Sequence, residues 1–239
     1  KPLCHGNPQM IGFPIRCKDK YLSMLVVQNN FNVRVIEQVT PAPDPKREIT
    51  GTFSPGTMLS TSEMTNNLMS VYIEHCSSFN NSISNKSTMY IGVSVIDLSI
   101  GNNTILETYS KKDDLNYPLY ELFRLIQSHN PVEIIISYDH LPNQMTQAEF
   151  VQFLEIESKR IQWSPSPSIN PDFKKKSYQN YFLKTIFHNT GLLSVVEFLD
   201  LEKREFGLIS YIILLNYAHK HNEIIISKIN IPTIWQESK

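Results

Sequence analysis

Four acidic residues lie in or next to predicted strands, where carboxylates are suited to metal-dependent chemistry. Two-metal phosphoryl transfer requires several carboxylates that converge on ions about 4 Å apart. An Asp that precedes a turn also commonly accepts hydrogen bonds from nearby backbone amides, and we favour this structural role for Asp97. A metal-dependent nuclease acting on structured DNA is therefore the alternative interpretation. Its candidate ligands are Asp97, Glu107, Glu133 and Asp139.

Other catalytic and metal-binding patterns are missing from the sequence. Cys4, His5 and Cys17 lack a C-x-x-C pair and a fourth zinc ligand. No G-x-x-x-x-G-K-S/T segment is present to hold nucleotide phosphates. We therefore predict no catalytic residue and no metal site, and a chain that is not itself an enzyme.

A proline-broken stretch, "EQVTPAPDPKREITGTFSPGT", covers residues 37–57. Pro41, Pro43 and Pro45 fix φ and remove backbone donors, so this elbow is predicted to stay extended outside any sheet. Lys46 and Arg47 follow on its outward side. They fit either a solvated loop or a contact with phosphate. We expect the elbow to join two folded regions and to limit bending between them.

The region after residue 61 has the element order of an α/β domain. Three β-rich segments are predicted to form consecutive antiparallel strands, and helices and strands then alternate. Thr146 and Glu149 have the spacing of a capping box at the start of one helix. This order predicts a ribonuclease-H-like domain with helices on both faces of its sheet. The predicted strands are 66–75, 88–99, 104–110, 132–137 and 160–164, the helices are 118–130, 146–159, 178–187 and 207–221, and residues 223–236 are extended.

The region before the elbow is predicted to hold one helix and two strands. Asp19 is placed to cap a helix that extends to about residue 30. Alternation then predicts a strand with Phe31, Val33 and Val35 facing inward, and residues 48–53 pair back with it. So few elements bury little surface, and we expect the rest of this layer upstream of Lys1.

Composition limits the class of protein. The chain has 239 residues, 41% of them hydrophobic, with a net charge of −1, so it has enough apolar residues for a core and is not basic over its whole surface. Three cysteines without paired spacing favour a reducing, intracellular compartment. No apolar run approaches the roughly 20 residues of a membrane span, and Leu208 to Ala218 is predicted to be a buried helix.

The first 58 residues contain an ordered series of motifs that resembles the second half of the mismatch-recognition domain of MutS proteins. The family pattern is M-x-G-x-P, a helix with Y-L, then E-Q, a linker, K-R or R, and T-P-G-T. This sequence shows Met10, Gly12, Pro14, Tyr21, Leu22, Glu37, Gln38, Lys46, Arg47, Pro55, Gly56 and Thr57 in that order.

The remainder is similar to the connector domain of the same family. Residues 66–102 resemble its first hairpin, residues 120–137 its helix and strand with an Asn-Pro turn, and residues 207–229 its last helix. The proline-rich form of the elbow resembles the divergent MutS branch of large DNA viruses and coral mitochondria. The resemblance implies three segments: residues 1–58 from the recognition domain, 59–223 as connector, and 224–239 leading toward the lever.

The resemblance implies a part of a mismatch repair protein that helps to bind mismatched double-stranded DNA and relays a signal. In the family, a Phe-x-Glu motif upstream stacks on the mismatch, and the clamp, lever and ATPase lie downstream. The parent would be a dimer that uses ATP and magnesium and docks a MutL-type partner, without a membrane, in a nucleus, mitochondrion, viral replication site or virion. The implied DNA-backbone contacts are Gly12, Pro14, Arg16, Lys18, Lys20, Lys46 and Arg47, with Arg16 where the family often has His. A plain interaction module without nucleic acid is a third reading.

Overall fold

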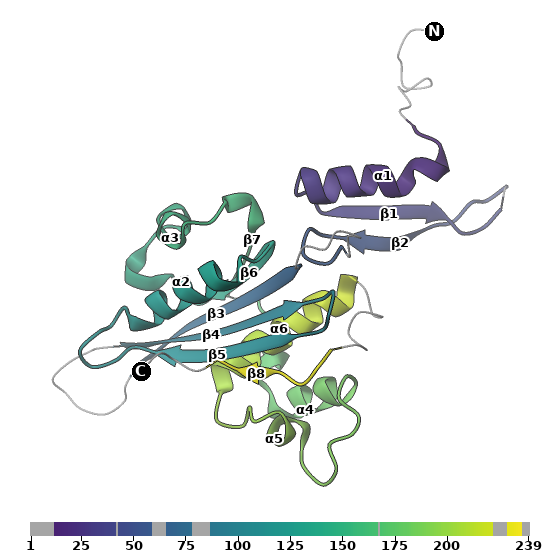
Figure 1. The fold of residues 1–239 in the computed structure, drawn as a ribbon. Coiled ribbons are helices and arrows are strands. Elements are labelled where there is room, and N and C mark those ends of the chain that lie inside the picture. The colour runs from purple at the N-terminus through teal and green to yellow at the C-terminus, as the bar shows by residue number, and fades with distance from the viewer. Residues whose placement is uncertain are drawn as a thin grey trace.

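The computed structural model describes residues 12–41, 43–58, 66–77, 87–166, 168–221 and 229–235. Cys4, His5 and Met10, which the sequence motifs include, lie outside these ranges. The chain forms a small first unit (residues 12–58) and a larger second unit (residues 66–235) built on a six-stranded sheet (Figure 1). No helix in the described ranges has the length and apolar character that crossing a membrane requires.

One helical segment covers a two-stranded sheet in the first unit. The segment consists of η1 (Ile15–Cys17), α1 (Lys18–Ser23) and the π-helical turn η2 (Met24–Gln28). The strands β1 (Val33–Gln38) and β2 (Arg47–Phe53) pair antiparallel, as predicted.

The side chains of the first unit follow the predicted pattern only in part. Leu22 and Val26, four residues apart, are buried between helix and sheet. Phe31 was expected inward but is 57% exposed. The helix changes to π geometry at Met24, which alters the register of the residues that follow. Asp19 lies in the first turn of α1 and does not cap it.

The proline-rich elbow is a hairpin loop, which corrects the expectation that it joins the two units. It connects β1 to β2 at the end of the first unit that points away from the second (Figure 1). The backbone N–H of Val39 donates to the carbonyl of Lys46 at 2.9 Å. Thr40 Oγ1 accepts from Lys46 N at 2.7 Å and donates to the Asp44 carbonyl at 3.1 Å, which closes the loop.

The sheet of the second unit is mixed, in the order β7-β6-β3-β4-β5-β8. The strands β3, β4 and β5, which come first in the sequence, form the predicted antiparallel meander. β6 pairs parallel with β3, β7 with β6, and β8 with β5. The strands are β3 (Asn67–Ser77), β4 (Ser87–Asp97), β5 (Asn103–Tyr109), β6 (Glu133–Tyr138), β7 (Ile161–Pro165) and β8 (Thr233–Ile234).

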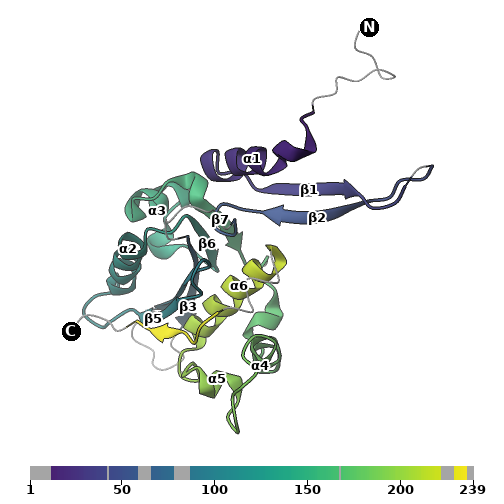
Figure 2. The ribbon, with the colours of Figure 1, turned by 45° about the vertical axis from the view of Figure 1, so that its right-hand side comes forward.

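Helices cover both faces of this sheet, as predicted (Figure 2). α2 (Tyr117–His129) and α3 (Gln147–Leu154) pack on one face, and α4 (Lys176–Lys184), α5 (Val195–Phe198) and α6 (Glu205–His221) lie on the other. The short helical turns η3 (Pro142–Gln144), η4 (Ser158–Arg160) and η5 (Pro171–Lys174) connect these elements. α5 and η5 were not predicted.

Strand alternation divides the core into two layers. On β4, Ile91, Val93 and Val95 face α2 and α3, whereas Ile96 faces α6. α6 is buried on most of its surface because α4 and α5 cover the side that the sheet leaves open. The predicted capping box of α3 is confirmed: Glu149 N donates to Thr146 Oγ1 at 3.3 Å, and Thr146 N donates to Glu149 Oε2 at 2.7 Å.

Candidate nucleic-acid interface and anchoring turn

Five of the seven predicted DNA contacts lie just before α1 or in its first turn. Gly12, Pro14, Arg16 and Lys20 are all exposed. The carbonyl of Pro14 accepts a hydrogen bond from Cys17 N at 2.8 Å, which forms the turn η1 that leads into the helix. Arg16 and Lys20 therefore project from a defined backbone with cationic groups free to meet an anion.

Lys18, the fifth predicted contact, forms an ion pair within the protein. Its Nζ lies 2.5 Å from Glu37 Oε1, near the end of β1. The Lys18 hydrogen bond and charge lower the pKa of Glu37. Lys18 thus ties the start of α1 to the end of β1, and it is the one predicted contact that the structure assigns to an intramolecular ion pair.

Lys46 and Arg47 complete the set at the base of the hairpin loop. Both are exposed, and Arg47 pairs with Gln38, the residue that follows Glu37. Because Lys18 holds Glu37, the start of α1 and the hairpin base come together at one end of the first unit. This end, called here the basic end, is the one farthest from the six-stranded sheet (Figure 1). Its exposed contact residues are Gly12, Pro14, Arg16, Lys20, Lys46 and Arg47.

Two apolar residues at the basic end were not predicted. Ile15 is 82% exposed, and Phe13 is also exposed with its ring centroid 4.4 Å from that of Tyr21. They directly precede the basic residues Arg16 and Lys18 in "GFPIRCK". An aromatic side chain close to cations was the available signal, because this combination is typical of single-stranded nucleic-acid contacts.

The opposite end of β2 enters a buried turn at residues 54–57, called here the anchoring turn. Ser54 N donates to Thr57 Oγ1 at 3.0 Å, and Thr57 N donates to the Ser54 carbonyl at 3.1 Å. Asn66 Nδ2 donates to the Gly56 carbonyl at 3.2 Å. All four residues of the turn are buried, so the turn has a fixed shape and a fixed position against the second unit.

Glu133 receives the anchoring turn at the start of β6. Glu133 as a whole residue is only 2% exposed. Oε2 accepts from Ser54 Oγ at 2.7 Å and from Gly56 N at 2.9 Å. Oε1 accepts from Gln162 Nε2 at 2.5 Å and from Tyr217 Oη at 2.7 Å. A buried carboxylate requires such donors, because desolvation disfavours its charge.

Tyr217 stays a hydrogen-bond donor in this cluster. Burial and then the neighbouring Glu133 carboxylate raise the pKa of Tyr217. Tyr217 comes from α6 and Gln162 from β7. One carboxylate therefore joins β6, β7, α6 and the anchoring turn.

The four candidate metal ligands do not converge. Asp97 Oδ1 accepts from Ser99 N at 2.9 Å, which confirms its predicted structural role. Glu107 lies in the middle of β5 and accepts from the N–H groups of Phe206 and Gly207, at the start of α6. Glu133 and Asp139 stand at opposite ends of β6, roughly 20 Å apart along the strand. In the described ranges, no group of three or more His, Cys, Asp or Glu is arranged to hold a metal ion.

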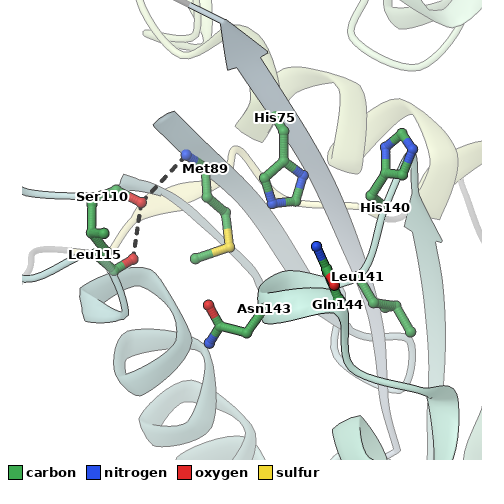
Figure 3. Close-up of a pocket in the computed structure, with 8 residues that line it drawn as sticks. All are labelled: His75, Met89, Ser110, Leu115, His140, Leu141, Asn143 and Gln144. Carbon is green, nitrogen blue, oxygen red and sulfur yellow. Dashed lines mark hydrogen bonds between the residues drawn. The ribbon is translucent and has the colours of Figure 1, made fainter. Parts of the chain in front are cut away.

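A cavity of about 450 Å³, whose lining residues are drawn in Figure 3, lies near the end of β3 and the start of β4. Because β3 and β6 are parallel, this is the opposite end of the sheet from Glu133, which begins β6. Beside the cavity, Asp139 accepts from His75 N at 3.0 Å and lies 3.1 Å from His75 Nδ1. Burial by itself raises the pKa of Asp139, but hydrogen bonds from His75 and His140 outweigh it and lower the pKa to about 2. The lining residues are His75, Met89, Ser110, Leu115, His140, Leu141, Asn143 and Gln144.

Comparison with known proteins gives consistent similarities along the chain. A family model described as MutS domain II matches residues 70–228, and one described as MutS domain I matches residues 3–62. A putative DNA mismatch repair protein of Acanthamoeba polyphaga mimivirus, a MutS homologue, is 30% identical over 263 aligned residues. The alignment covers 100% of this chain and 23% of the viral protein, so the chain spans less than a quarter of that relative.

Proposed function

This chain belongs to the MutS family of DNA mismatch repair proteins, and from that premise we propose that its basic end contacts the DNA backbone beside a mismatch. The observation that carries the proposal is the common position of six exposed contact residues at the end of the first unit that faces away from the second. Phosphate contacts fix position and orientation on a duplex without reading its sequence, which suits this role.

The second unit is proposed to be a ribonuclease-H-like connector that relays the consequences of DNA binding. An antiparallel meander extended by parallel strands, with helices on both faces, supports this assignment. The proposed division is residues 1–58 for the recognition part, 59–223 for the connector and 224–239 for the segment toward the lever. β2 supports the relay, because this one strand extends from Arg47 at the basic end to the anchoring turn.

Catalysis is proposed to reside elsewhere in the parent protein. The matched models are MutS domains I and II, and the four carboxylates of the nuclease alternative are engaged at separate places. We assign ATP and magnesium, a MutL-type partner and dimer formation to the parent, and we place the parent at a viral replication site by analogy with its viral relative.

The test is the salt dependence of DNA binding by the full-length protein. Lys46 and Arg47 are replaced together by Gln, and binding to a duplex with one mismatch is followed by fluorescence anisotropy between 50 and 200 mM salt. Each phosphate contact contributes about 0.9 to the slope of log affinity against log salt. The double variant is expected to lose about one to two units of slope and on the order of tenfold in affinity per contact at 0.1 M salt.

Lys184 and Lys203 provide the matched control, because both are exposed on the second unit. Their replacement by Gln removes the same number of charges and is expected to leave the slope unchanged. Equal slopes for the wild type and the Lys46/Arg47 variant, or equal losses in both double variants, would refute the basic end as the DNA contact.

A further inference from the structure

Hydrogen bonds to one buried carboxylate contribute to the contact between the two units. Glu133 belongs to the second unit, and its Oε2 accepts from Ser54 and Gly56 of the first unit. Its Oε1 accepts from Gln162 and Tyr217 of the second unit. Hydrogen bonds to an ionised, buried acceptor are about twice as strong as neutral ones. Oε2 thus binds the first unit, and Oε1 binds the second.

The anchoring turn fits against Glu133 without spare room. A Cβ atom built on Gly56 would lie 2.8 Å from Glu133 Oε2, 2.9 Å from Glu133 Cβ and 2.8 Å from Leu68 Cδ1. Real Cβ atoms do not approach other heavy atoms so closely, so a side chain at position 56 would push the turn away. Gly56 is required here by close approach, which lets its N–H reach the carboxylate.

The position of this contact along β2 gives it mechanical importance. β2 has seven residues and is about 20 Å long, with Arg47 at the basic end and Phe53 next to the anchoring turn. β2 pairs with β1 on both sides of a single bulge at Thr50, and this pairing couples a displacement at Arg47 to Ser54. β2 also contacts α6, the helix that carries Tyr217.

We infer that Glu133 is the positioning residue that couples the first unit to the second, so that strain at the basic end is transmitted to the sheet and α6. The inference deepens the proposed relay and rests on it. The contact involves no bond making, and the carboxylate acts only by holding the anchoring turn. Without Glu133, the first unit still folds and still presents its basic end. The Asn66 hydrogen bonds and the contact of β2 with α6 remain, but they hold its orientation relative to the sheet less firmly.

The direct test measures protection of the Gly56 amide by hydrogen exchange in the full chain, followed by NMR. Glu133→Leu removes all four acceptor contacts while keeping similar volume, and the Gly56 N–H is expected to exchange at least tenfold faster. Glu121→Leu is the matched control, because Glu121 is also a buried glutamate, at 4% exposure, but lies on α2. It is expected to leave Gly56 exchange unchanged.

Glu133→Gln provides a graded variant. Its amide oxygen can keep the Gly56 N–H, because Gln162 and Tyr217 can reorient to accept from the new NH2 group. Exchange of Gly56 is expected to rise less than threefold. Gly56→Ala disrupts the same contact from the side of the turn. The double variant with Gly56→Ala and Glu133→Leu should therefore exchange the amide at position 56 no faster than the faster of the two single variants. Fully additive increases would contradict a shared contact.

The functional test uses the full-length protein and two readouts. Glu133→Leu is expected to keep the salt slope of DNA binding, which the basic end sets, but to lower mismatch-stimulated ATP hydrolysis at least fivefold. Glu121→Leu keeps both. If Glu133→Leu speeds hydrogen exchange at Gly56 but leaves mismatch-stimulated ATP hydrolysis unchanged, the coupling inference is wrong. If the Lys46/Arg47 variant leaves the salt slope unchanged, the proposed DNA contact fails instead, and the two failures are distinct.

Discussion

Gly92 on β4 lies directly against the backbone carbonyl of Phe206 at the start of α6. A Cβ atom built on Gly92 would sit 2.0 Å from that carbonyl oxygen. Because the obstacle is backbone, no rotamer change relieves it, and α6 would have to move away from the sheet. Gly92→Ala is expected to destabilise the protein by about 3 kcal/mol, measured as a loss of unfolding free energy in urea.

Gly207 provides the control for this prediction. It also lies at the start of α6, but the closest atom to its Cβ would be the side-chain atom Ile105 Cγ2 at 3.1 Å, and Glu107 Cβ and the Leu106 carbonyl oxygen would lie at an ordinary contact distance of 3.5 Å. A side chain can yield, and alanine favours the helix by about 0.5–1 kcal/mol over glycine. Gly207→Ala is therefore expected to be neutral within about 1 kcal/mol. Equal destabilisation by the two variants would contradict the backbone contact at Gly92.

Tyr211 and Tyr217 on α6 should respond in opposite directions to the same change. Tyr211 is 0% exposed, and its hydroxyl has no hydrogen-bond partner in the described ranges. Tyr211→Phe removes this buried polar group and should stabilise the protein by about 1 kcal/mol. Tyr217→Phe removes a donor to the Glu133 carboxylate and should cost about 2 kcal/mol. Urea unfolding of both variants measures the two changes in unfolding free energy. Changes of the same sign would refute the different roles assigned to the two hydroxyl groups.

The Asp139 carboxylate is expected to make a pH-dependent contribution to the free energy of unfolding. Its pKa is lowered from 3.8 to about 2, so the folded state favours the charged form and the contribution is present above pH 4. It is lost as the pH falls through about 2. Asp139→Asn should cost about 2 kcal/mol at pH 7, and the difference from the wild type should vanish between pH 4 and pH 2. Unfolding free energies measured over this range test it; a constant difference would contradict it.

The prolines of the hairpin loop should not influence the contact between the units. Pro41, Pro43 and Pro45 lie at the far end of β2 from the anchoring turn. Replacing all three with Ala is expected to leave hydrogen exchange at Gly56 within twofold of the wild type and to leave mismatch-stimulated ATP hydrolysis unchanged. A large increase in Gly56 exchange would restore the elbow as the joint between the units.

Regular patterns in the sequence were sufficient for most of the fold. Alternation of apolar residues predicted the meander β3-β4-β5, and the Thr146 and Glu149 spacing predicted the cap of α3. These signals are local, because each depends on residues within one strand or one helical turn. The first unit was less predictable: the π turn at Met24 leaves no clear mark in the sequence, and it alters which side chains face the sheet.

The contacts that position the site were not predictable from local patterns. A proline-rich stretch has the same composition in a hairpin loop as in a linker between units, so the elbow was misplaced. Glu133 was noted only as a candidate metal ligand at the start of a strand. Its four donors come from Ser54, Gly56, Gln162 and Tyr217, which only the folded chain brings together. Nothing in the spacing of these residues announces the cluster.

The late position of β8 in the chain has a consequence for synthesis on the ribosome. β8 completes the sheet by pairing Thr233 with Thr104 of β5, and Asn230 accepts from Asn103 nearby. A nascent chain therefore exposes the outer edge of β5 at Thr104 and Ile105, which β8 later covers, until more than a hundred further residues have been translated, which takes on the order of ten seconds. An uncovered strand edge is a template for pairing with other chains. Slow translation through this interval should thus favour aggregation over folding.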